Sequence, residues 1–184
     1  MEPIRSDGHT ISTPRLPQAK RFTAKLRSDL QAVENKSHVL PRVRVYIELN
    51  HVGPWTTGSG SFVNDAIRAA GGENVFENES RGVFQTTNDE IRKRDPEVIL
   101  SPIWPDAKIG GIDGITTIAE ITSRPGFSQI QAVRNSRVLY YDSALVKQGG
   151  PREVLGIRKL AHLLHPAEFP DPPGTIPWEL GRIR

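Results

Sequence analysis

The chain has 184 residues, of which 36% are hydrophobic and 24% charged, as is ordinary for a soluble protein of one domain with or without an appendage. Its formal net charge is only +3 and its basic residues are dispersed, which does not indicate nucleic-acid binding. No apolar run approaches the roughly 20 residues that a membrane span needs, and the lack of cysteine excludes disulfides and thiolate metal sites.

The N-terminal part predicts a leader followed by a long helix. Residues 1–17 are polar, contain three prolines and lack the apolar core of a secretory signal, so we expect a disordered leader. In residues 18–36, one helical stripe is formed by Phe22, Leu26, Leu30 and Val33. Residues 43–49 then predict a strand, because they are apolar and β-branched.

The stretch "PWTTGSGSF" (residues 54–62) predicts a sharp turn from this strand into a helix. Ser59 or Ser61 can cap the helix, and Gly71-Gly72 supplies a left-handed stop. The expected buried face comprises Phe62, Val63, Ala66, Ile67 and Ala70. A very short strand at residues 74–76 and a loop follow, and "TNDE" predicts a capping box that opens the next helix at Thr87.

The remaining chain continues the alternation of strands and helices. We expect strands at residues 97–101 and 137–142, and helices near residues 116–121, 126–133 and 151–164, before a proline-rich tail at residues 170–184. This order predicts an α/β three-layer sandwich with a central, mainly parallel sheet (a Rossmann-like lobe), preceded by the long helix.

In such sheets, ligands bind outside the carboxyl ends of the strands, here residues 49–57, 101–106 and 142–148. Trp55 and Trp104 occupy corresponding positions after two of the strands, which indicates an aromatic rim for a large flat or apolar ligand. Packing of Trp55 against the loop after residues 97–101 is an equally good interpretation. His51 lies on the same surface, but a single imidazole is weak evidence for a metal site.

Nucleotide binding and catalysis are poorly supported. After Gly58 and Gly60, the third glycine of a dinucleotide fingerprint is missing, and no Gly-Lys-Ser/Thr follows. Ser59 and Ser61 have no recognisable base. We therefore expect neither enzymatic activity nor a cofactor.

Four segments together resemble one family: "RVYIELNHVGPWTTGSGSFVNDAIRAAGGENVF", "IRKRDPEVILSP", "RPGFSQIQAVRNSRVLYYDS" and "GPREVLGIRKLAHLLHPAEF". It is the family of substrate-binding proteins of cobalamin, iron-siderophore and haem ABC importers. The resemblance covers about residues 18–169. It implies two α/β lobes joined by a long helix, with this chain carrying that helix at residues 18–40 and the C-terminal lobe at residues 41–169. The N-terminal lobe and export signal are expected to be absent.

The resemblance also implies site residues. The family's ligand-facing positions fall near Leu49, Trp55 and the Val83-Phe84 segment, with Val83 where the cobalamin binder has tryptophan. An acidic position after the last strand corresponds to Ala144, with Asp142 close by. The family docks on the membrane subunit through an acidic residue at a helix start, which corresponds to Asp89 with Glu90 adjacent. For Asp89, docking and helix capping both stay open, and for Glu90 capping is favoured.

The resemblance implies a solute-binding component for a corrinoid or another metal chelate, with the ABC transporter membrane subunit as partner and a periplasmic or cell-surface location. The lack of a recognisable signal leaves a cytoplasmic location open. Alternatively, a lone lobe acts as a structural module that forms a homodimer through the face left by the other lobe. An enzyme of nucleotide-binding type is the least favoured of the three functions.

Overall fold

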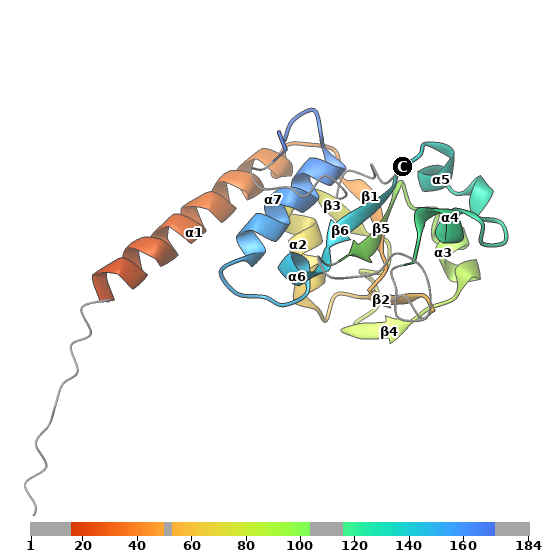
Figure 1. Ribbon diagram of the computed structural model, residues 1–184, viewed down its shortest axis with the longest axis horizontal. Coiled ribbons are helices and arrows are strands. Elements are labelled where there is room, and N and C mark those ends of the chain that lie inside the picture. Colours follow the sequence, from red (N-terminus) through yellow and green to blue (C-terminus); the bar gives the residue numbers. More distant parts are fainter. Residues whose placement is uncertain (1–15, 50–52, 104–115, 172–184) are drawn as a thin grey trace, which may run out of the picture.

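The computed structural model describes residues 16–49, 53–103 and 116–171, shown in Figure 1. In the order of the chain, the elements are α1 (Leu16–His38), β1 (Val43–Ile47), β2 (Trp55–Thr57), α2 (Phe62–Ala69), β3 (Gly72–Asn74), β4 (Val83–Gln85), α3 (Asn88–Arg94), β5 (Val98–Ile103), α4 (Ile118–Thr122), the 3-10 helix η1 (Phe127–Gln129), α5 (Gln131–Arg134), β6 (Val138–Asp142), α6 (Ser143–Val146) and α7 (Glu153–Leu164). No helix among these residues is long and apolar enough to cross a membrane.

The central sheet is parallel, as predicted. Its strand order is β3-β1-β5-β6, and each neighbouring pair runs in the same direction. A separate antiparallel pair, β2 with β4, lies beside it. The crossover from β1 to β3 contains α2, and that from β5 to β6 contains α4, η1 and α5, which is how parallel neighbours are joined.

The alternation of side chains along the strands divides the core into two. Val45 and Ile47 of β1 join a cluster with buried residues of α1, α2 and α7, whereas Tyr46 between them points into a cluster with residues of α3 and α4. Figure 1 shows the two groups of helices on opposite sides of the sheet. Because successive strand residues face opposite sides, this arrangement confirms the predicted three-layer fold.

The long helix α1 contacts the rest of the lobe only near its C-terminal end. Val33 and Ser37 are buried, whereas residues 17–25 are all exposed and extend away from the sheet in Figure 1. The predicted apolar stripe is therefore split, and Phe22 is 53% exposed. Ser37 anchors the helix, because its hydroxyl donates to the carbonyl of Ala69 at 2.7 Å.

Several local predictions need correction. Phe62 was expected in the buried face of α2 but is 45% exposed, because it is the first residue of the helix and lies beyond the sheet-facing stripe. Gly71 has the predicted left-handed backbone, with φ +91°, whereas Gly72 already begins β3. The strand β3 thus starts two residues earlier than expected, and the expected loop before Thr87 contains β4.

The capping box predicted at Thr87 is half formed. The Thr87 hydroxyl accepts the backbone N–H of Glu90, but the Glu90 carboxylate lies 3.9 Å from Arg94. A full capping box occurs instead at α4. There the Thr117 hydroxyl accepts the N–H of Glu120, and the Glu120 carboxylate accepts the N–H of Thr117.

Candidate functional site

Hydrogen bonds link the segment after β1 to β2 and to the segment that follows β6 and α6. Leu49, just after β1, is buried; its N–H donates to the carbonyl of Trp55 at 2.8 Å. Its own carbonyl accepts from the Lys147 ammonium at 2.6 Å, and Lys147 follows α6 after β6. Burial lowers the pKa of Lys147. The predicted strand-end surface is thus a set of interlinked segments.

The β2–β4 pair places Trp55 and Val83 on the same face. Trp55 lies opposite Gln85, and Thr57 lies opposite Val83, so these four side chains share one side of the ribbon. Val83 is 58% exposed, and the half-buried Trp55 packs partly against the core cluster of α1, α2 and α7. Trp55 and Val83 therefore occupy diagonal positions on one face of the ribbon, with Gln85 and the buried Thr57 as their direct cross-strand partners.

Phe84 lies on the opposite face of this ribbon and is buried. Its ring centroid lies 5.8 Å from that of Phe76 in an edge-on arrangement, and the Arg81 guanidinium covers it at 4.0 Å. Since adjacent strand residues point in opposite directions, Val83 and Phe84 do not face one ligand together. In this structure Phe84 contributes to packing.

The first two N–H groups of the glycine-serine turn bond to the backbone of residues 79–82. The N–H of Gly58 donates to the carbonyls of Arg81 and Gly82, and that of Ser59 to the carbonyl of Glu79. A Cβ on Gly58 would lie 2.1 Å from the Glu79 carbonyl oxygen, so glycine is needed where residues 79–82 cross the turn. The turn serves close packing, and two of its donors, the N–H groups of Gly58 and Ser59, are already used.

Asp142 has a structural role at the end of β6. It is buried, and Oδ1 accepts the N–H groups of Ala144 and Leu145 at 3.0 and 3.3 Å. It therefore caps α6. His51 and Trp104 lie outside the described residues. Among the residues that the structure describes, no group of three or more His, Asp or Glu side chains is arranged to hold a metal ion.

Asp89 is a well-exposed carboxylate near the start of α3. Its side chain is 83% exposed and lies 2.6 Å from Arg92, one turn along the helix. The cap of the helix is Thr87, not Asp89. The helix dipole favours an acidic group here, but the exposed position gives Asp89 little part in packing.

Thr87→Ala is expected to lower the free energy of unfolding by about 1 kcal/mol, because the N–H of Glu90 loses its side-chain acceptor. Asp89→Ala should change it by less than about 0.5 kcal/mol, since exposed ion pairs contribute little. Urea denaturation of the two variants measures both values. A larger loss for Asp89→Ala than for Thr87→Ala would show that Asp89 serves mainly to hold the helix.

A buried ion pair beneath this surface was not predicted. Glu48 is fully buried and forms two hydrogen bonds with the Arg124 guanidinium, at 2.7 and 2.8 Å. Burial opposes the charge of Arg124, but its hydrogen bonds to Glu48 and the negative charge of Glu48 raise its pKa. Burial also raises the pKa of Tyr46, whose hydroxyl donates to Glu48 at 3.2 Å. The sequence signal for this ion pair was the position of Glu48 within the otherwise apolar end of "RVRVYIEL", where a buried carboxylate needs a partner.

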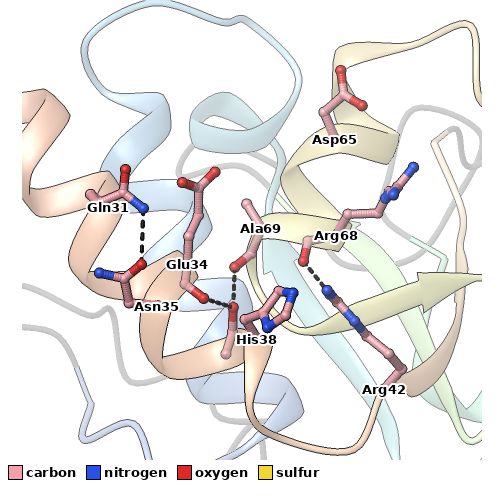
Figure 2. A pocket seen from close by; sticks show the side chains of 9 residues that line it. Gln31, Glu34, Asn35, His38, Arg42, Asp65, Arg68 and Ala69 are labelled. Atoms are coloured by element: carbon pink, nitrogen blue, oxygen red, sulfur yellow. Dashed lines mark hydrogen bonds between the residues drawn. The ribbon is translucent and has the colours of Figure 1, made fainter.

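A hollow of about 420 Å³ lies away from the strand ends, between α1 and α2. Figure 2 shows its labelled polar side chains, including Glu34 on α1 and Asp65 on α2. Arg42, which precedes β1, donates to the carbonyl of Arg68 at 2.5 Å. This hollow is thus next to the amino end of β1, and we do not include it in the candidate ligand surface.

Comparisons with known proteins agree with this architecture. The "Uncharacterized ABC transporter substrate-binding lipoprotein YvrC" of Bacillus subtilis (strain 168) is 27% identical over 156 residues, which are 83% of this chain and 46% of that protein. The chain therefore spans about half the length of this curated relative.

Two solved structures share the fold. An ABC-type Fe3+-hydroxamate transport system protein from Saccharomonospora viridis DSM 43017 has a TM-score of 0.67 and 22% identity, covering 82% of this chain and 50% of that one. The periplasmic heme-binding protein RhuT from Roseiflexus sp. RS-1 has a TM-score of 0.67 and 17% identity, covering 83% of this chain and 57% of that one.

The family description "Periplasmic binding protein" matches residues 15–145, which is more than half of the chain. The chain therefore belongs to the periplasmic binding protein family.

Proposed function

We propose that this chain is a solute-binding lobe of an ABC import system for a metal chelate, such as a ferric siderophore, haem or cobalamin. The observation that carries the proposal is the shared face of Trp55 and Val83 beyond the strand ends. A planar or bulky ligand gains contact area and loses water on such a face. The names of the relatives, which include hydroxamate transport and haem binding, favour this ligand class.

Binding on this lobe uses contact and desolvation and needs no chemical step. Trp55 stacks on the ligand, Val83 extends the apolar area, and the linked segment of Leu49 and Lys147 keeps Trp55 in place. His51 and Trp104 remain proposed contributors from the same strand-end segments. Asp142 contributes indirectly, because it caps α6. Phe84 packs into the core on the opposite face of the β2–β4 ribbon.

The proposed partner is the membrane subunit of the transporter, approached through Asp89. An exposed carboxylate suits an arginine on the partner, since such charge pairs mainly set the register and rate of association. Arg92 already pairs with Asp89, so a transporter arginine would share or displace it. Action at the outer face of the membrane, as a periplasmic or cell-surface protein, is part of this proposal. The relative's printed name, a substrate-binding lipoprotein, favours it.

Titration with haemin, a ferric hydroxamate and cyanocobalamin, followed by chelate absorbance and calorimetry, tests the proposal. We expect one of them to bind in the micromolar range, and Trp55→Ala to weaken that binding at least tenfold, about 1.4 kcal/mol. Val39→Ala is the matched control, because Val39 is 79% exposed and follows the last residue of α1, away from the β2–β4 pair. No response to any of the three at high micromolar concentration would remove the ligand proposal.

A homodimer through the strand-end surface, with no ligand, is the second candidate function, favoured by the exposed Val83. Val83→Asp would then separate the dimer in light scattering. A nucleotide-binding enzyme is disfavoured, because the glycine turn has its Gly58 and Ser59 donors occupied. We expect ATP and NAD to leave the thermal midpoint unchanged.

A further inference from the structure

The buried ion pair of Glu48 and Arg124 lies next to the proposed ligand-binding segment. Glu48 directly precedes Leu49, whose N–H is bonded to the carbonyl of Trp55. Both carboxylate oxygens of Glu48 accept hydrogen bonds from the Arg124 guanidinium, at 2.7 and 2.8 Å. Because a bidentate pair fixes orientation as well as distance, Arg124 is expected to follow any displacement of the end of β1.

Arg124 begins a stiff turn, residues 124–126. Its side chain is only 17% exposed, and its guanidinium lies 5.6 Å from the centre of the Phe127 ring, so packing restricts its rotamer. Pro125 has its φ fixed by its own ring, and the carbonyl of Arg124 accepts the N–H of Phe127 at 3.0 Å. The Arg124 side chain and the backbone of the turn are therefore expected to move together.

Arg92 lies on the far end of this turn and pairs with Asp89. A Cβ on Gly126 would lie 2.7 Å from Nη1 of Arg92 and 2.8 Å from its Cδ, so the arginine packs directly on the bare glycine backbone. The other terminal nitrogen of Arg92, Nη2, lies 2.6 Å from Oδ1 of Asp89. All three residues line one hollow of about 430 Å³ between α3 and η1. The turn thus supports the side chain that pairs with the proposed docking carboxylate.

The backbone around this contact is held in place, which leaves the Arg92 side chain as the part that can move. The Asp95 carboxylate, just after α3, accepts the N–H of Gln131 at 2.8 Å. The carbonyl of Pro96 accepts the N–H of Ala132 at 3.0 Å. Because these bonds join the end of α3 to the start of α5, a change in the turn is expected to shift Arg92 and to leave α3 in position.

We propose that the turn of residues 124–126 couples the segment after β1 to the docking residue Asp89. The turn moves with the carboxylate of Glu48 at one end and supports Arg92 at the other. This inference rests on the proposed function, which makes the segment after β1 part of the ligand surface and Asp89 the docking residue. A ligand beside Leu49 then changes how firmly Arg92 holds the carboxylate that a transporter arginine would bind. Since coupling between two binding sites is reciprocal, docking changes the ligand affinity by the same factor.

Gly126→Ala tests the contact between the turn and Arg92. The added methyl group displaces the Arg92 side chain, so its Nε–H signal in NMR spectra of isotope-labelled protein should move toward its position in Asp89→Ala, where the ion pair is absent. Gly150→Ala is the matched control: Gly150 also has a positive φ, +89°, but a Cβ there would meet nothing within 4 Å. Both variants place an L residue at positive φ. An Arg92 signal that stays unchanged in Gly126→Ala, or moves equally in both, overturns the proposal.

Glu48→Gln tests the other end of the turn without ligand or transporter. The amide retains the size of the carboxylate but loses its charge and one of the two acceptors for Arg124. Hydrogen exchange of the Phe127 N–H should accelerate at least about fivefold, the lower end of typical coupling between sites, and the Arg92 signal should move. Where circular dichroism shows this variant to be unfolded, Arg124→Lys replaces it, because lysine keeps the charge but not the bidentate pair. A folded variant with both readouts unchanged contradicts the coupling.

Addition of haemin, a ferric hydroxamate or cyanocobalamin separates this inference from the proposed function. A chelate that binds should move the Arg92 signal of the parent protein and leave that of Glu48→Gln in place. Binding with no change at Arg92 retains the ligand proposal and overturns the coupling. If none of the three binds, the ligand proposal fails, while the variants without ligand still decide whether the turn connects Glu48 to Arg92.

Discussion

Arg124→Met is expected to lower the free energy of unfolding by about 3–5 kcal/mol, the usual effect of leaving a buried charge unpaired. Glu48 is fully buried and its two carboxylate oxygens both bond to the Arg124 guanidinium. Without the arginine, the hydroxyl of Tyr46 is the remaining side-chain donor that the structure places on this carboxylate. Urea denaturation followed by circular dichroism measures the loss.

The double variant Glu48→Met/Arg124→Met separates the unpaired charge from lost packing. Replacing both members of a buried ion pair with apolar residues is often nearly neutral, so the double variant should be more stable than Arg124→Met alone. A single variant within about 1 kcal/mol of the parent would contradict this, as would a double variant whose loss equals the sum of both single losses.

Gly58→Ala is expected to destabilise the protein by about 3 kcal/mol, at the upper end of the usual cost of overpacking. The added Cβ would lie 2.1 Å from the Glu79 carbonyl oxygen and 2.8 Å from that of Arg81. Both are backbone atoms, so relief requires residues 79–82 to move away from the turn. Because β4 follows directly and pairs with β2, the tryptophan fluorescence, to which Trp55 contributes beside Trp104 and Trp178, should change together with stability.

Ser59→Ala is the matched control for this glycine. It introduces the same residue next in the chain, where the side chain is exposed and its hydroxyl donates one hydrogen bond to Glu79. We expect a change below about 0.5 kcal/mol. Equal losses for the two variants would show that the close backbone approach at Gly58 does not set the structure of the turn.

The layers of the fold could be predicted because they depend on local patterns. Strands of β-branched and apolar residues alternate with helices whose ends are marked by residues next to them. For α2 these are the N-cap Ser61 and the left-handed Gly71. The ribbon of β2 and β4 could not be found this way. Each strand has three residues, and their pairing joins positions about thirty residues apart, which no local pattern encodes.

The placement of Leu49 and Trp55 along the chain could be predicted, but the directions of the side chains in the proposed site could not. The strand-end rule located Leu49 and Trp55, and the structure places both after β1 as expected. Which of Val83 and Phe84 faces outward depends on the register of β4 against β2, which the sequence does not reveal. The ion pair of Glu48 and Arg124 was not predicted, because its two residues lie 76 positions apart in the sequence.

The hydrogen bond from the Leu49 N–H to the Trp55 carbonyl has a consequence for protein engineering. It joins the two ends of residues 50–54, while Lys147 holds Leu49 independently from the segment after α6. Segments closed at their base tolerate changes of length at small entropic cost. Changes of length in this connection are therefore expected to cost little stability and to leave the strands and Trp55 in place, as long as the Thr86 N–H keeps its hydrogen bond to the Pro54 carbonyl.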